Sequence, residues 1–403
     1  MTKTKQRVAS VMYHSIGIPT EKWHWNYLTC PYEVFEDQLK WLKKTGYKTL
    51  NFQEVYDFVI NEKAIPKNAV FLTFDDGYLD NYVFAYPLLK KYGFKGTIFV
   101  NPDFVDRSTG YRKTLEDVND KEEIAELAIT GFCNWDELKK MDEEGVLDVQ
   151  SHAKTHTWYP VSDKIIDFRH PGDDYVWMNW NDDAENKPNL QCIDWERVQF
   201  GTPVFEHEKA LSCKRVFINS NYIQKITNYV KENGGVVFFE KDNWREDLFE
   251  LSEELKKSIA VIEREESDED YVKRMTFELQ FTKEELEQRL NKKVEFICWP
   301  GGSATKKGVE IADKLGYLMS TAARDIPELR KKIKNSPSYK INRIARFVPI
   351  VYNNWKKPSD INKIKYSQGW FFIFQIMRFD NRYFAAFWMK YVIFLMYKLR
   401  IHV

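Results

Sequence analysis

The sequence predicts an α/β fold in which parallel strands alternate with helices, as a barrel or a doubly wound sheet. Apolar, strand-like runs alternate with helical periods from the N-terminus to about residue 156, which is typical of parallel βα units. The 403 residues suffice for one barrel-sized domain with appendages. Polar residues directly follow several predicted strands, where α/β proteins place their chemistry.

The first βα unit consists of a strand over Val8–Tyr13 and a helix over Pro31–Thr45. Pro31 suits a first helical turn and Gly46 suits a helix end. Apolar residues recur in this helix at helical spacing, at Tyr32, Phe35, Leu39 and Leu42.

The next units repeat this alternation. We expect strands over 68–74, Gly96–Val100 and Leu147–Gln150, and helices over Phe52–Asn61, Leu79–Tyr92 and Trp135–Glu144. Further along, we expect a helix over Trp244–Arg264, an acidic loop over Glu265–Asp270, a helix over Thr282–Leu290 and a strand over Val294–Cys298.

Residues 157–240 break the alternation and indicate a large insertion rich in Trp, Asp, Asn and Pro. Its aromatic side chains could line a substrate cleft, or they could form a small core of the insertion itself. These aromatic residues are Trp158, Tyr159, Tyr175, Trp177, Trp180 and Trp195.

The tail over 351–403 contains two strongly apolar runs, 370–377 and 383–399. The second run is short for a membrane span and carries Lys390 in its middle. We expect amphipathic helices through 370–403 that lie in a membrane interface, or that pack on the protein or on a second subunit.

Composition excludes some classes of partner. The 60 basic and 60 acidic residues balance, so no net field favours nucleic acid. Five scattered cysteines argue against a disulfide framework and for a reducing compartment. The N-terminus reads as direct entry into a strand, so we expect a cytoplasmic protein, with peripheral contact to the inner face of the membrane as an option.

The central candidate site is the pair Asp75 and Asp76, which follows a β-branched and aromatic strand. Neighbouring strand residues point to opposite sides, so one carboxylate can bind a metal while the other handles a proton. The alternative is a simple Asp-Asp-Gly turn.

His152 and His156 follow the strand that ends at Gln150. If a helix begins there, both imidazoles lie on one face of its first turn and reach one ion. Two imidazoles and a carboxylate leave coordination positions open, as hydrolytic metal sites require.

Two more strand ends carry candidate groups. Trp299, Pro300, Gly301 and Gly302 follow an apolar strand, and glycine backbone there can approach a ligand or simply form a tight turn. His14 follows the first strand, either as a catalytic group or as a hydrogen-bonded core histidine.

Three motifs together resemble the polysaccharide deacetylases, also called NodB-homology or carbohydrate esterase family 4 proteins. They are TFDDG at 73–77, SHxxTH at 151–156 and the Pro-Gly-Gly strand end at 300–302. The resemblance covers residues 8 to about 156 and about 270 to 350. It implies a distorted (β/α) barrel over 1–350, with 157–240 inserted as a cap and 351–403 as a tail.

The resemblance also implies site roles. Asp75 resembles the general base, and Asp76, His152 and His156 resemble the metal ligands. A backbone N–H near Gly301 is expected to bind the oxyanion, and Trp299 beside it is expected to lie on the substrate side of the site. The implied cofactor is a divalent ion, zinc first and Co, Ni or Mn as alternatives.

Two departures from the family pattern stand out. Cys298 occupies the place of the arginine that usually orients the base, and Arg343 or Arg346 could substitute for it. The usual late Leu-x-His is absent. His14 resembles the first-strand histidine of the poly-N-acetylglucosamine deacetylases, and is our candidate general acid.

The resemblance therefore implies a metal-dependent N-deacetylase of an amino sugar. We expect its substrate to be a nascent surface glycan or a lipid- or nucleotide-linked precursor. Alternatives are a deformylase or O-deacetylase with the same site, a non-catalytic glycan-binding protein, or a membrane-bound scaffold.

Overall fold

A parallel sheet forms the centre of the fold, and apolar strands explain why it is buried. All six residues of β5 are buried, and β1 pairs with it in parallel register from Ala9–Val70 to Tyr13–Phe74. The computed structural model describes residues 8–20, 28–188, 197–322, 342–349 and 369–379, with 387, 388, 391 and 395. The strand order is β1 (Ala9–Tyr13), β5 (Ala69–Phe74), β6 (Gly96–Val100), β7 (Leu147–Ser151), β12 (Phe296–Ile297), β13 (Met319–Ala322) and β14 (Asn342–Ala345), and β4 (Lys48–Leu50) pairs with β5.

The chain after β14 closes this sheet into a barrel. Phe347 pairs in parallel with Val11 of β1. Its N–H donates to Ser10 O at 3.0 Å, and its carbonyl accepts from Met12 N at 2.9 Å. The predicted (β/α) barrel is therefore confirmed, with the carboxyl ends of its strands meeting at one rim.

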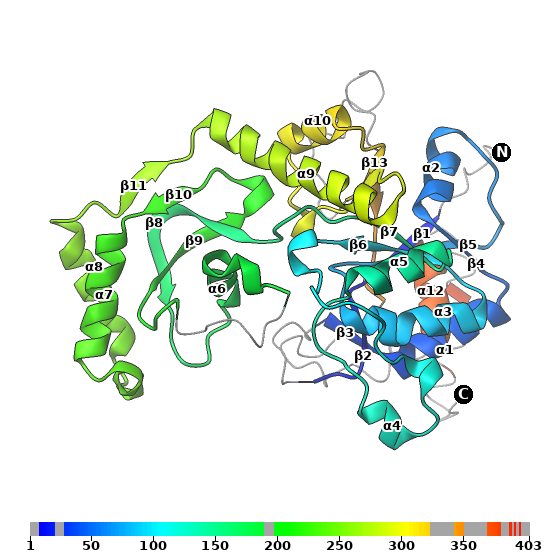
Figure 1. Ribbon diagram of the computed structural model, residues 1–403, viewed down its shortest axis with the longest axis horizontal. Helices are drawn as coiled ribbons and strands as arrows, with labels where there is room; N and C mark the ends of the chain where they lie inside the picture. Colours follow the sequence, from blue (N-terminus) through cyan, green and yellow to red (C-terminus); the bar gives the residue numbers. More distant parts are fainter. Residues whose placement is uncertain are drawn as a thin grey trace.

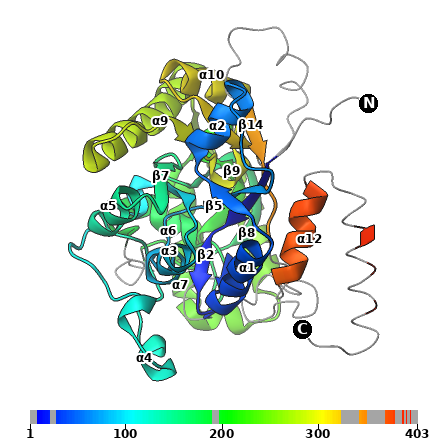
Figure 2. The same ribbon diagram turned by 90° about the vertical axis from the view of Figure 1, so that its right-hand side faces the viewer.

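Helices cover the outside of the barrel (Figures 1 and 2). Their N-caps follow the sequence: Asn51 and Asn134 each form a capping box with a glutamate three residues on. The helix predicted over Leu79–Tyr92 begins instead with a π-helical turn over Asn81–Ala85. The barrel helices are α1 (Tyr32–Lys44), α2 (Phe52–Ile60), α3 (Tyr86–Tyr92), α5 (Trp135–Glu143) and α10 (Lys306–Lys314). The short helix α4 (Lys121–Ala125) projects away from the barrel (Figure 1).

The inserted segment leaves the barrel after β7 and extends to one side of it, in green in Figure 1. It reaches further along the chain than 157–240, because β11 ends at Glu265. In it, β8 pairs with β9 and β10 pairs with β11, and both pairs are antiparallel. The elements are β8 (Trp158–Phe168), α6 (Val176–Asp182), β9 (Pro203–Lys209), β10 (Val216–Ile218), α7 (Ser220–Glu232), α8 (Trp244–Lys256) and β11 (Ile262–Glu265); β2 (Ser15–Gly17) and β3 (Thr29–Pro31) pair beside the barrel.

The insertion has apolar cores of its own. One core gathers residues of β8, β9, α7 and α8, including Phe168, Tyr222 and Leu248. A second contains Trp177 and Trp180, packed against Phe104 and other barrel-side rings. These two tryptophans therefore stabilise the packing of the insertion against the barrel. Trp195 lies outside the described residues.

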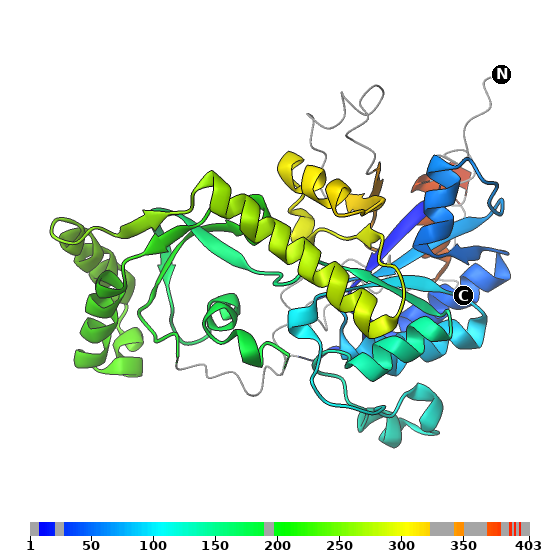
Figure 3. The same cartoon turned by 45° about the horizontal axis from the view of Figure 1, so that its top comes forward.

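A single long helix, α9 (Asp268–Leu290), returns the chain from the insertion to the barrel (Figure 3). The predictions of a loop over Glu265–Asp270 and a helix starting at Thr282 were wrong. Ser267 caps the helix, and the acidic run Asp268–Asp270 forms its first turn, where the helix dipole favours negative charge.

One helix of the predicted tail is described, α12 (Gly369–Phe379), which packs beside α1 (Figure 2). Phe372, Ile373 and Ile376 on it are buried in the main core. The rest of 351–403 lies almost wholly outside the described residues. Within the described part of the chain, no helix is long and apolar enough to cross a membrane.

Candidate active site

Asp75 and Asp76 follow β5 at the carboxyl rim of the barrel, and their side chains serve different neighbours. The Asp75 N–H donates to Tyr13 O of β1 at 3.0 Å. Asp76 has a left-handed backbone, with φ of 73°, which turns its carboxylate away from that of Asp75. Both are buried, at 2% and 5% exposure.

Asp75 is held by the guanidinium of Arg346. Arg346 Nη1 donates to Asp75 Oδ1 at 2.6 Å, and Nη2 donates to Oδ2 at 2.8 Å. Burial raises the pKa of Asp75, but Arg346 outweighs it and holds the pKa below its usual value. This bidentate pair fixes the orientation of the carboxylate and keeps it ionised.

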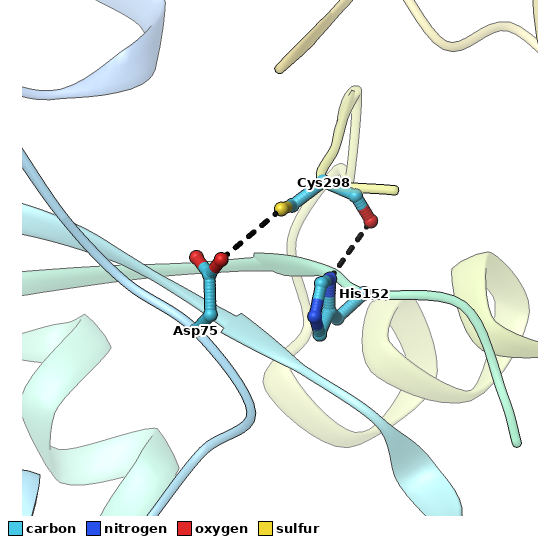
Figure 4. Close-up of side chains that lie close together, drawn as sticks. All are labelled: Asp75, His152 and Cys298. Atoms are coloured by element: carbon cyan, nitrogen blue, oxygen red, sulfur yellow. Dashed lines mark hydrogen bonds between the residues drawn. The ribbon is translucent and has the colours of Figure 1, made fainter. Parts of the chain in front are cut away.

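Cys298 lies between Asp75 and His152 (Figure 4). Its Sγ is 3.5 Å from Asp75 Oδ2 and accepts from Arg346 Nη2 at 3.0 Å. The backbone carbonyl of Cys298 accepts from His152 Nδ1 at 2.8 Å. Asp75, His152 and Cys298 are close enough to form a metal-binding group, but the Arg346 cation opposes a second cation there.

Asp76 faces the two histidines. Its Oδ1 lies 3.1 Å from His152 Nε2 and 3.4 Å from His156 Nε2. Burial lowers the pKa of His156 to about 4, so this imidazole is neutral and can donate a lone pair. Burial also lowers the pKa of His152, but Cys298 and Asp76 outweigh it and raise the pKa above its usual value.

These three side chains fit a divalent cation. Among the described residues, the buried Asp76 Oδ1 makes no hydrogen bond of good geometry and has only the two imidazole nitrogens close to it, which is costly unless another group satisfies it. The three donor atoms lie close enough to share one ion. Two imidazoles and one carboxylate are a ligand set that zinc and neighbouring first-row ions accept.

The loop that carries the histidines is not a helix turn, so that prediction was wrong. Ala153 and His156 both have left-handed backbones, with φ of 55° and 41°. Asn101 holds the first half of the loop, because its Nδ2 donates to His152 O and, at 3.1 Å, to Ala153 O. The loop brings the two rings to a centroid distance of 5.3 Å.

His14 lies at the mouth of the same site. Its Nε2 is 3.9 Å from Asp75 Oδ2 and 4.0 Å from Asp76 Oδ2. The side chain is 17% exposed, so it can meet both the carboxylates and a ligand. Asn81 Nδ2 donates to His14 O at 2.9 Å and fixes the backbone.

The Pro300–Gly302 turn follows β12, and Gly301 has a left-handed backbone with φ of 50°. Lys209 of the insertion donates to Gly301 O. Trp299 is only 2% exposed and belongs to the main core, so direct contact with a ligand is not expected from it. The backbone of Arg343 is part of β14, but its side chain lies outside the described structure.

Two site-side residues, Asn101 and Lys209, were missed from the sequence, whereas Trp158 was among the aromatic residues expected to line a cleft or a core of the insertion. Asn101 and Lys209 hold the loops just described. The Trp158 ring lies 5.7 Å from the His156 ring, and Trp158 pairs with Lys209 across β8 and β9. A polar residue directly after the β6 strand was a usable signal for Asn101. The position of Lys209 depends on how the insertion folds back.

Comparisons with known proteins fit this geometry. Residues 62–182 match the family model described as polysaccharide deacetylase. That part of the chain contains both aspartates and both histidines of the site. Over this segment the chain is similar to the polysaccharide deacetylases.

Curated members of the family match part of the chain. A putative polysaccharide deacetylase, YxkH of Bacillus subtilis, is 33% identical over 155 residues, which are 38% of this chain and 45% of that protein. A poly-beta-1,6-N-acetyl-D-glucosamine N-deacetylase of Staphylococcus aureus is 33% identical over 102 residues, 25% of this chain and 34% of that one. The chain thus spans less than half the length of these relatives.

Among solved structures, a de-N-acetylase from Aggregatibacter actinomycetemcomitans aligns over 85% of this chain and 94% of its own. Its sequence identity is 16% and its TM-score 0.49. In this chain, His14, Cys298, Gly301 and Arg346 lie outside the residues that match the family model.

Proposed function

We propose that this protein is a metal-dependent hydrolase that removes the N-acetyl group from an amino sugar of a glycan or of its precursor. One observation carries the proposal: the adjacent aspartates have separate partners. Asp75 is paired with Arg346, whereas Asp76 faces His152 and His156. This separation gives one carboxylate to proton transfer and the other to a cation.

In this mechanism Asp76, His152 and His156 would hold the divalent ion. When bound, the ion supplies Lewis acidity toward the amide carbonyl and the attacking water. Zinc is the first candidate, and Co, Ni and Mn are alternatives.

Asp75 accepts the proton of the attacking water as general base, and Arg346 orients it. His14 is 3.9 Å from Asp75 and donates a proton to the leaving amine as general acid. The carboxylic acid leaves as acetate and the sugar retains a free amine. A backbone N–H at Gly301 is the proposed donor to the oxyanion.

The substrate class rests on the relatives. Those matched include proteins named poly-beta-1,6-N-acetyl-D-glucosamine N-deacetylases, so a β-linked N-acetylglucosamine oligomer is the first substrate to test. Lipid- and nucleotide-linked N-acetyl sugars follow. Deformylation and O-deacetylation remain alternatives for the same site, and contact of the tail with a membrane remains a prediction.

The test is acetate release by purified protein, with and without chelator, over oligomeric, lipid-linked and nucleotide-linked N-acetyl sugars. We expect release from one class and its loss with chelator. Asp75→Asn should retain metal but lose activity, whereas Asp76→Asn should lose both. Acetate release that survives Asp75→Asn would exclude Asp75 as the base, and no release from any class would favour a binding protein.

A further inference from the structure

The loop that carries His152 and His156 has a strained backbone that needs contacts from outside the loop. Ala153 and His156, both non-glycine residues, have positive φ, a conformation that persists only where neighbouring groups impose it. Asn101 fixes the carbonyls of His152 and Ala153. The second half of the loop, which orients His156, needs a separate restraint.

That restraint converges on Thr155. Glu278 Oε2 accepts from the Thr155 hydroxyl at 2.8 Å and from its N–H at 3.4 Å. Lys187 Nζ donates to the Thr155 carbonyl at 3.0 Å. The N–H, the hydroxyl and the carbonyl of the residue before His156 therefore all have partners on these two side chains.

Both side chains come from outside the metal loop and outside residues 62–182. Glu278 lies on α9, the helix that returns from the insertion (Figure 3). Lys187 belongs to the inserted segment, just after α6, and its Nζ also lies 3.3 Å from Asp103 Oδ2. The insertion and α9 are thus connected to the metal loop through these two side chains.

Because Glu278 and Lys187 are buried, the stability of the fold alone does not explain the presence of their charges. Glu278 and Lys187 are each only 2% exposed. Burial raises the pKa of Glu278 and lowers the pKa of Lys187, so both charges are disfavoured by their surroundings. Glu278 Oε1 has no hydrogen-bond partner among the described residues, and Arg274 approaches it only to 3.9 Å. An ion network with such incomplete pairing contributes little to folding.

We propose that Lys187 and Glu278 are positioning residues that clamp Thr155 and thereby aim His156 at Asp76. Through them, the insertion and α9 set the affinity of the site for its cation. This inference rests on the proposed function, because it requires that the site binds a metal.

The experiment measures zinc affinity of the full chain by competition with a chelating dye. Glu278→Met removes the acceptor for Thr155, and Lys187→Met removes the donor; we expect each to weaken zinc binding at least tenfold. Glu278→Gln keeps an acceptor oxygen without the charge and should recover most of the affinity. The visible spectrum of bound Co²⁺ should change in the two methionine variants, because a displaced His156 alters the ligand field.

Glu137→Met is the matched control, since Glu137 is buried and paired with Arg112 away from the site. It should lower the unfolding temperature while zinc affinity stays unchanged. Hydrogen exchange at 153–157 in metal-free protein should accelerate only in the Glu278 and Lys187 methionine variants.

The outcomes separate the two proposals. Absence of zinc binding by the wild-type chain would overturn the metal-dependent function and this inference with it. Tight binding by wild type with equal affinity and equal loop exchange in the methionine variants would overturn the clamp alone. An affinity loss equal to that of Glu137→Met would also reject it, because destabilisation would then explain the effect.

Discussion

Arg346 binds both carboxylate oxygens of Asp75, although the two residues are 271 positions apart in the chain. Arg346 directly precedes Phe347, whose backbone joins the last strand to β1. The segment that closes the barrel therefore also delivers the partner of the proposed base. Cys298 occupies the position expected for an arginine, and it contacts the same guanidinium through Sγ.

Arg346→Met should move the acidic limb of kcat/KM to higher pH. Arg346 lowers the pKa of Asp75 against the effect of burial, so its removal leaves burial to raise that pKa. Asp75 is then protonated, and inactive as a base, over more of the acidic range. At pH 6 we expect a loss on the order of 100-fold, the size of a general-base contribution.

The measurement for Arg346 is a pH–rate profile with metal content determined in parallel. Arg289→Met, which removes an exposed arginine paired with Glu285, should keep the wild-type profile. An unshifted acidic limb in Arg346→Met would contradict the orienting role.

His14→Ala should reduce turnover of N-acetyl substrates by about 10² to 10⁴, the range for a general acid, with metal content unchanged. Hydrolysis of an aryl acetate should fall far less, because a phenolate leaves without a proton. Rates on the two substrates, compared in one preparation, test this. Equal losses on both would assign His14 to binding or structure instead.

Asp80→Asn should stabilise the protein above neutral pH. Asp80 is buried beside Ser15, and burial raises its pKa to about 7. The pKa of Asp80 is higher in the folded state than in the unfolded state. Its contribution to folding stability is therefore fully present below a pH of about 4 and is lost as pH rises through about 7. The cost above pH 7 is up to about 4 kcal/mol, at 1.36 kcal/mol per pKa unit.

Urea unfolding at pH 5 and pH 8 checks the Asp80 effect. Wild type should lose stability between these values, and Asp80→Asn should lose less. The same pH dependence in both proteins would show that Asp80 is not the group responsible.

Ile373→Ala on α12 should destabilise the fold by about 2–4 kcal/mol, as for other buried Ile→Ala changes. Ile373 is 0% exposed within the main core, which favours packing of this helix on the protein. Thermal unfolding measures the effect, with Phe387→Ala, at a side chain 59% exposed, as the control. A change of under 0.5 kcal/mol, the size typical of surface substitutions, would instead indicate a peripheral helix.

Local pattern predicted the strands β1, β5, β6, β7 and β12 and both ligand-bearing strand ends, because buried strands leave a strong apolar signal and polar residues at their ends stand out. It did not predict β4, β13 or β14. Asp75, Asp76, His152 and His156 could thus be found from the sequence. Their meeting depended only on parallel strands sharing one rim.

Long-range contacts explain what the sequence could not settle. Arg343 and Arg346 were equal candidates, since only the pairing of Phe347 with β1 decides which one faces Asp75. The loop over 152–156 resembled a helix start, but contacts from Asn101 and Glu278 impose left-handed residues there. The acidic stretch at the start of α9 resembled a loop, but Ser267 caps the helix and Asp268–Asp270 form its first turn.

The closing segment around Phe347 is also made late in synthesis. A nascent chain that ends at residue 322 already contains Asp75, Asp76 and both histidines, but it has neither Arg346 nor the closing strand pair. Its Asp75 would be buried without a counter-charge and would hold its proton. Under the proposed function, activity would therefore require this closing seam, and fraying of the seam would separate Arg346 from Asp75.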